Sequence, residues 1–271
     1  MKPSALFLAA AVLAAPVFSH AYTFDGDVPE AVKEQITTDM GFMASLEGSA
    51  GSSLHKEIFE SDTIQGAAYK NFFESRVTSV GMNSCGGGNA VACVIPWRDS
   101  SKIWLTQHYV RFSHPQVAKM MVVFHEARHT EVQNGNWHHA NCPDPFLDES
   151  GQEIRSIWTG ASLGGEAACD ETAFGSYSSS MIMLKNISKF CTNCTDKVKL
   201  DAGIYADDQF KRVIDQESRA KIIADLYQQE GEQPANPGQP QNPVIDPPGF
   251  WDPWWPSPVK AAAAPGSLVQ R

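Results

Sequence analysis

The stretch QVAKMMVVFHEARHTEVQ (residues 116–133) predicts the helix around which this chain folds. Ser113 is a suitable cap before it, Pro115 fits its first turn, and Asn134-Gly135 supplies a stop signal. The apolar run MMVVF (residues 120–124) inside the stretch predicts that this helix is buried in the core.

The same helix carries the pattern His-Glu-x-x-His, from His125 to His129. Two histidines four residues apart lie one turn apart on one face, so both imidazoles can reach a single metal ion. Glu126 lies beside the first histidine, where it can take a proton from zinc-bound water. The pattern therefore predicts a zinc site with Glu126 as the catalytic residue. The alternative is a helix with two surface histidines and an ordinary glutamate.

A catalytic zinc site usually has three protein ligands and one open position, so a third ligand must come from another segment. Glu166 and Asp170 are four residues apart, and a buried helix predicted over residues 167–184 would bring them to one face. The candidates for the third ligand are Glu166, Asp170 and His139.

The stretch GGEAACD (residues 164–170) resembles the helix of thermolysin-like (gluzincin) metallopeptidases that reads Glu-Ala-x-x-Asp after two glycines. The resemblance implies a zincin-like domain in which Glu166 binds zinc. It also implies that Asp170 accepts the second ring N–H of a ligand histidine. The order of HEARH, His139 and Cys169-Asp170 is also similar to that of some uncharacterised secreted bacterial proteins, which keeps His139 open as a ligand.

Two further side chains are candidates for stabilising an oxyanion, namely Tyr177 and His138. Either could instead be a structural residue held by ordinary hydrogen bonds. Neither belongs to a fixed motif, so only their position relative to the metal site can decide.

Six cysteines predict an oxidising compartment, and their spacing allows several pairings. We favour the disulfides Cys85–Cys93, Cys142–Cys169 and Cys191–Cys194. The last pair belongs to a CxxC motif that could alternatively be a redox or metal pair, but the chain offers no second CxxC to complete a four-cysteine zinc site.

Both ends of the chain differ in composition from its middle. Residues 1–21 predict a signal peptide cleaved after Ala21, with Lys2 before a short apolar run. Residues 22–230 predict one catalytic domain, and residues 231–271 a Pro- and Trp-rich disordered tail. No later stretch is apolar for long enough to span a membrane. The predicted localisation is therefore secreted or periplasmic.

The formal net charge of −10 argues against nucleic acid as a partner. We expect a helix-rich, zincin-like α+β fold with a small sheet packed on the motif helix. The predicted function is an exported zinc-dependent hydrolase, a peptidase acting on peptide or protein substrates. The alternative is a secreted binding or cell-surface protein with a structural metal or none. That protein would dock to a partner or the envelope through an aromatic group in the tail: Phe250, Trp251, Trp254 and Trp255.

Overall fold

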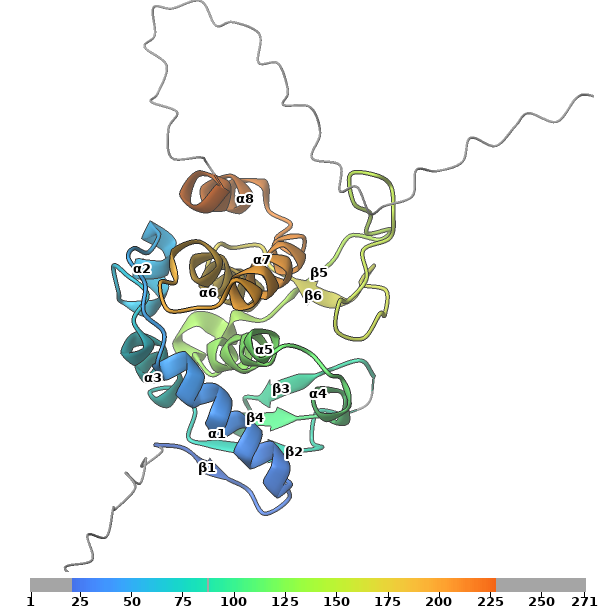
Figure 1. Cartoon of the computed structure of the whole chain (residues 1–271). Helices are drawn as coiled ribbons and strands as arrows, with labels where there is room; N and C mark the ends of the chain where they lie inside the picture. Colours follow the sequence, from blue (N-terminus) through green and yellow to red (C-terminus); the bar gives the residue numbers. More distant parts are fainter. Residues whose placement is uncertain (1–20, 87, 228–271) are drawn as a thin grey trace, which may run out of the picture. The chain divides into compact units, whose positions relative to one another are not determined.

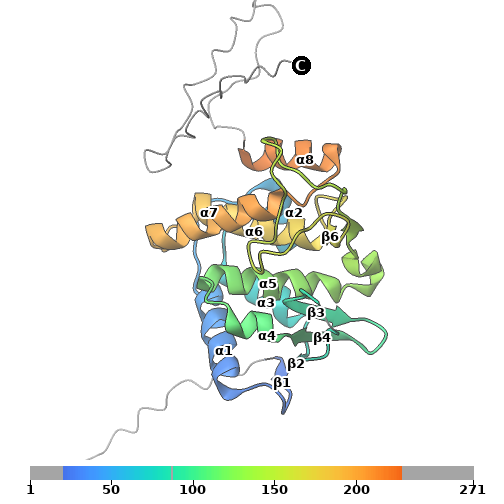
Figure 2. The same cartoon turned by 90° about the vertical axis from the view of Figure 1, so that its right-hand side faces the viewer.

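The computed structural model describes residues 21–86 and 88–227. Helix α5 (Gln116–His129) lies at the centre of this part of the chain (Figure 1). Of its 14 residues, 11 are buried. A small sheet packs against one side of α5, and helices α6 (Ser176–Phe190) and α7 (Asp196–Phe210) pack against the other (Figures 1 and 2). A helix covered on nearly every side can be apolar all round, as the stretch MMVVF requires.

The sheet has four strands in the order β1-β2-β4-β3. Their bounds are β1 Thr23–Phe24, β2 Ser79–Met82, β3 Ala92–Ile95 and β4 Asp99–Leu105. β2 pairs in parallel with both β1 and β4, whereas β3 runs antiparallel to β4 as the outer strand. The last three residues of β4, Ile103, Trp104 and Leu105, are of types that favour strands, and all three are buried.

The N-terminal helices pack beside α5. Helix α1 covers Glu30–Ala44, and Pro29 is its N-cap. Helix α3 covers Gly66–Glu74, the middle part of the amphipathic stretch TIQGAAYKNFFESRVTSV (residues 63–80). A short helix that was not predicted, α2 (Ser53–Phe59), begins at a cap in which the Ser52 side chain accepts the His55 backbone N–H.

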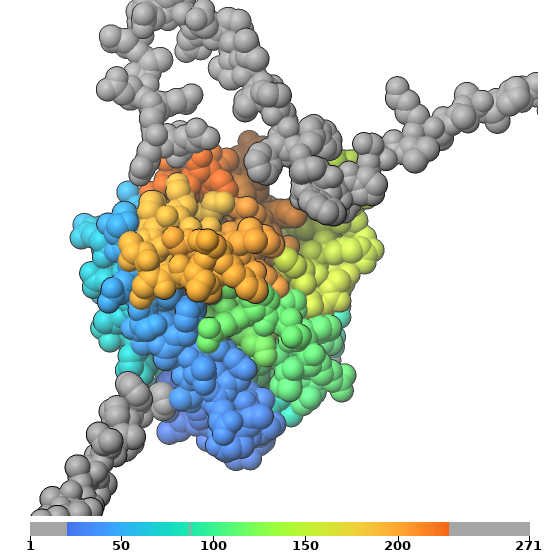
Figure 3. Space-filling view, viewed as in Figure 1, coloured from blue at the N-terminus to red at the C-terminus, as the bar shows by residue number. Residues whose placement is uncertain are grey.

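The remaining elements are short apart from α6 and α7. They are α4 Gln107–Arg111, the 3₁₀ segment η1 Val132–Trp137, β5 Ala140–Asn141, β6 Ala167–Cys169, α8 Gln216–Ile222 and the π-helical segment η2 Ile223–Tyr227. In Figure 3 the N-terminal segments (blue) lie at one end, the helices α7 and α8 (orange) at the other, and the middle of the chain (green) between them.

One predicted helix is wrong in its first part. Residues 167–184 were expected to be helical, but residues 167–169 form β6 and the helix begins only at Ser176. β6 pairs antiparallel with β5, which satisfies the backbone hydrogen bonds of this stretch in another way. Glu166 and Asp170 therefore do not share a helical face.

The structure contains the three disulfides favoured from sequence: Cys85–Cys93, Cys142–Cys169 and Cys191–Cys194. Their presence fits an oxidising compartment. Within the described residues, no helix is long and apolar enough to cross a membrane. The predicted signal peptide, up to residue 20, and the predicted tail over residues 231–271 lie outside the described residues.

Phe124 provides a test of the core around α5. Its side chain is 1% exposed, and its ring packs against those of Phe72 and Tyr69 at centroid distances of 5.8 and 6.0 Å. We expect Phe124→Ala to lower the free energy of unfolding by about 3–5 kcal/mol, because it removes apolar contacts and leaves a cavity. Urea unfolding measures this change. Val132→Ala, at a side chain that is 57% exposed, serves as the control and should change it by less than about 0.5 kcal/mol.

Candidate metal centre

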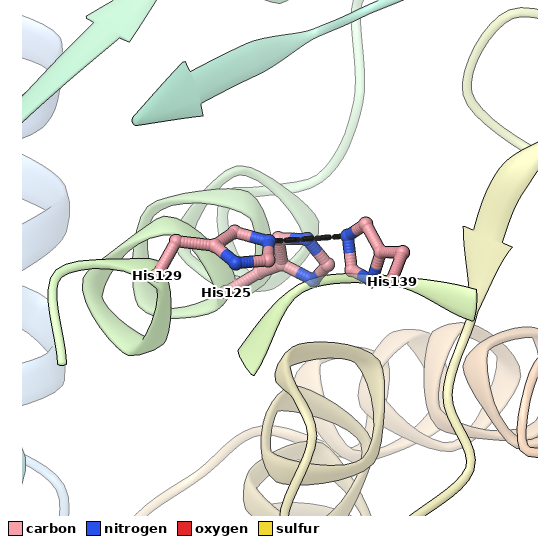
Figure 4. A group of neighbouring side chains, drawn as sticks. All are labelled: His125, His129 and His139. Atoms are coloured by element: carbon pink, nitrogen blue, oxygen red, sulfur yellow. Dashed lines mark hydrogen bonds between the residues drawn. The ribbon is translucent and has the colours of Figure 1, made fainter. Parts of the chain in front are cut away.

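Three histidine side chains meet at the C-terminal end of α5. His125 and His129 lie one turn apart on this helix, and His139 comes from the segment just before β5 (Figure 4). The three Nε2 atoms lie 3.1–3.2 Å from one another. Such a convergence of one atom type from three rings suggests a common ligand.

The second ring nitrogens of His129 and His139 each face an acceptor. His129 Nδ1 lies 2.7 Å from the carbonyl oxygen of Asn136. His139 Nδ1 lies 3.2 Å from Oδ1 of Asp170. Both acceptors require a proton on Nδ1, which leaves the Nε2 atom of each neutral ring with a free lone pair.

His125 is in the same protonation state. Its ring hydrogen-bonds to the backbone of Ser176, and this bond favours the protonated ring, so the Ser176 carbonyl is the acceptor. Since Nε2 faces the other two histidines, Nδ1 makes this bond. Burial, followed by the charge of His129, holds the pKa of His125 well below its usual value, so the ring is neutral at pH 7.

Three Nε2 lone pairs therefore point at one another, and neutral rings arranged in this way repel. A cation at their centre removes the repulsion. In a tetrahedral zinc site with Zn–N bonds of about 2.0–2.1 Å, two nitrogens lie about 3.3–3.4 Å apart. The observed separations of 3.1–3.2 Å are close to this value. Among the described residues, no fourth histidine, cysteine or carboxylate joins this group. The donor set thus fits a metal with one open position.

Asp170 orients His139 and is itself held in place. While Oδ1 faces His139, Oδ2 accepts the backbone N–H of Ser178 at 2.9 Å, in the first turn of α6. Gly175 leaves room for this carboxylate, because a Cβ there would lie 2.2 Å from Oδ2. The disulfide Cys142–Cys169 joins the segments that carry His139 and Asp170. The helix N-terminus favours a charged carboxylate, which in turn favours the Nδ1–H form of His139.

A buried carboxylate, Glu131, organises the turn between α5 and His139. Oε1 accepts hydrogen bonds from Arg76 Nε at 2.7 Å and from Arg128 Nη1 at 2.6 Å. Oε2 accepts from Asn134 and from the indole N–H of Trp137, both at 2.7 Å. Together these bonds connect the helix that bears two ligands to the turn that precedes the third.

Glu126 lies next to His125 and is only 5% exposed. Its Oε2 has no hydrogen-bond partner within the described residues. Burial raises the pKa of this carboxyl to about 8, partly offset by the backbone N–H of Val94. A buried, unpaired carboxylate oxygen is costly to maintain, which favours a role with a ligand in the adjacent cavity.

The three histidines line a cavity of about 740 Å³. Its walls come from β3, α5, the segment before β5, residues 156–168 and the turn after α7. The lining residues of interest are His125, Glu126, His129, His138, His139, Glu166, Tyr177 and Arg212. Predicted site residues from four separate segments therefore surround one space.

Among the other predicted site residues, Asp170 contacts a histidine of the group as the resemblance implied, whereas Glu166 does not join the group. Glu166 is exposed in the bend before β6 and does not join the three histidines, whose third member is the alternative His139. Asp170 lies behind His139 as the acceptor of its second ring nitrogen. The Tyr177 ring lies 4.3 Å from that of His125, whereas His138 is exposed at the cavity rim. The proposed oxyanion roles of Tyr177 and His138 stay predictions.

Sequence reasoning missed Arg212 and Glu131. Arg212 follows α7 and lines the cavity, and no motif marks it. Glu131 could have been suspected from its position three residues after Arg128 on one helical face. Its bonds to the following turn, in contrast, depend on how that turn folds.

Comparisons of the chain with protein-family models, with curated proteins and with solved structures found no match. The chemistry of the site must therefore be inferred from its own residues. The helix-rich α+β class with a small sheet is confirmed, while the zincin-like resemblance stays a prediction.

The neighbouring histidines 138 and 139 allow a matched test of the ligand set. We expect the chain to bind about one zinc ion and His139→Ala to lose it, because two remaining ligands hold zinc poorly. His138→Ala, which removes an exposed ring, should retain the metal. Elemental analysis of protein purified without chelator measures the ratio. Glu166→Gln should also retain zinc; its loss there would restore Glu166 as the ligand.

Asp170→Asn tests the orientation of His139. The amide keeps the size of the side chain but removes the charge that favours the Nδ1–H form of His139. We expect zinc affinity to fall about 10- to 100-fold, as measured by competition with a chromogenic chelator. Glu171→Gln changes an exposed neighbour and should leave the affinity unchanged. Equal affinity of the Asp170→Asn variant and the parent chain would mean that Asp170 does not tune the site.

Proposed function

We propose that this protein is an exported zinc-dependent hydrolase, and that its substrates are peptides or proteins. The proposal is supported chiefly by the buried Glu126, which has an unpaired carboxyl oxygen and lines the same cavity as the three converging histidines. Zinc sites that only stabilise a fold usually have four protein ligands, whereas catalytic sites keep a position open. Here three candidate ligands border a cavity large enough for a substrate.

Zinc bound to the three histidines would supply Lewis acidity, polarising a carbonyl group and acidifying water. Glu126 has the position and chemistry of the general base. With a pKa of about 8, the Glu126 side chain is mostly protonated at pH 7 in the absence of metal. The charge of a bound zinc ion would favour its carboxylate form, which would accept a proton from the attacking water and pass it to the leaving amine. Because the site is largely buried, proton transfer would occur away from bulk water.

The outer strand of the sheet favours a peptide as substrate. β3 pairs with β4 on one side only within the described residues, and Ala92, Cys93 and Val94 line the cavity. An extended peptide can add to such an edge through main-chain hydrogen bonds. This would hold a peptide bond near the metal centre without a requirement for one particular side chain.

The catalytic role of Glu126 is tested by Glu126→Gln. This variant should bind zinc as the parent chain does, because no metal ligand changes. Hydrolysis of a mixed peptide library, followed by mass spectrometry, should fall about 10²- to 10⁴-fold, since a general base is lost.

Glu149→Gln, which changes an exposed carboxylate, controls for the loss of one negative charge and should leave hydrolysis intact. If the Glu126→Gln variant cleaves the library as fast as the parent chain, Glu126 is not the base. If the zinc-loaded parent chain cleaves no peptide, the site performs another reaction.

A further inference from the structure

Arg212 is a buried cation for which the described residues provide no ion pair. Its side chain lines the cavity of the metal centre, and the residue is 6% exposed. No carboxylate of the described chain lies within 4.0 Å of its guanidinium nitrogens, and its Nε has no hydrogen-bond partner. Arginine is rarely buried without a counter-charge, so an anionic group outside the described residues is the expected partner.

The surroundings of Arg212 hold the guanidinium in place without neutralising it. Its Cζ lies 4.5 Å from the centre of the Tyr177 ring. Asp208 is a buried carboxyl. Burial raises its pKa more than the charge of Arg212 lowers it, so Asp208 is a weak counter-charge for this arginine.

Tyr177 connects this cation to the metal centre. Its ring also lies beside the rings of His125 and His139, at centroid distances of 4.3 and 4.5 Å. The backbone carbonyl of Arg212 also accepts the N–H of Asp170, the residue that orients His139. Arg212 is thus fixed one aromatic ring away from the three histidines and borders the same cavity.

We propose that Arg212 binds a carboxylate of the substrate while the scissile bond lies at the metal centre. This inference rests on the proposed function for the identity of the substrate, but the anion site itself is independent of hydrolysis. A planar guanidinium matches a carboxylate with two parallel hydrogen bonds. A single arginine, in a cavity that the carboxylate of Glu166 also lines, suits a singly charged group better than a phosphate dianion.

Two parts of a peptide could supply this carboxylate: its C-terminus or an acidic side chain. Three probes separate these sources. The first is acetylated trialanine with a free C-terminal carboxylate, and the second is the same peptide as its C-terminal amide. The third is acetylated Ala-Asp-Ala amide, in which only the side chain is charged.

Binding of the three probes is measured by isothermal titration calorimetry after addition of zinc. The Glu126→Gln chain is used so that no probe is consumed. We expect one of the two charged probes to bind about 10- to 100-fold more tightly than the neutral amide, as charge-assisted hydrogen bonds of about 1.5–3 kcal/mol imply. Whichever charged probe shows the preference identifies the source of the carboxylate.

Adding Arg212→Gln should reduce this preference to less than about threefold. Lys211→Gln is the matched control: it removes the same charge from an exposed neighbour and should retain the preference. Arg212→Lys keeps the charge without the planar fork and should retain part of it. Thermal unfolding checks that each variant is folded. If Arg212→Gln does not fold, Arg212→Lys takes its place. The preference for the charged probe over the neutral one should then be weaker in the Arg212→Lys chain than in the chain that keeps Arg212.

Equal binding of charged and neutral probes, or no binding of any probe, would overturn the carboxylate site. A preference that persists in folded Arg212→Gln would overturn the role of Arg212. Hydrolysis of the same peptides by the parent chain is measured separately. Cleavage without a carboxylate preference would support the proposed hydrolase and overturn the carboxylate site. A preference without cleavage would support the carboxylate site and overturn the proposed hydrolase.

Discussion

The central constraint on this structure is that α5 buries polar side chains along with its apolar ones. His125, Glu126 and Arg128 are all at most 8% exposed, on a helix that is otherwise part of the core. Each buried polar group lowers the stability of the fold unless it has a hydrogen-bond partner. The segments that follow α5 supply these partners: Glu131 for Arg128 and the Ser176 backbone for His125. Glu126 keeps an unpaired carboxylate oxygen, and the residue lines the cavity where chemistry is proposed.

This constraint also explains how short elements far apart in the chain combine into one site. The turn organised by Glu131 leads to His139, and the pairing of β5 with β6 brings Asp170 behind it. The disulfide Cys142–Cys169 joins the same two segments covalently. The N-terminus of α6 then holds the second oxygen of Asp170. Ligand orientation therefore depends on backbone pairing and one carboxylate, not on a second long helix.

Sequence patterns were reliable where the underlying interaction is local. The start of α1 at Pro29 follows from the fixed φ of proline, and the strand within β4 follows from its run of Ile103, Trp104 and Leu105. The same logic failed for residues 167–175. The four-residue spacing of Glu166 and Asp170 matched a helical face, but pairing with β5 gave this stretch a different set of backbone hydrogen bonds. Tertiary pairing outweighs a weak local preference.

By itself, the sequence determined that His125 and His129 face one way with Glu126 beside the first, because an α-helix repeats every 3.6 residues wherever it occurs. It also supported the three disulfides, a compartment that permits them, and the helix-rich class with a small sheet. Only the tertiary structure decided that His139 completes the group and that Arg212 shares the cavity. His139 follows an irregular turn, and Arg212 lies in the turn after α7. Their positions depend on contacts with Asp170, which lies 31 and 42 residues away from them in the chain. No local periodicity encodes such contacts.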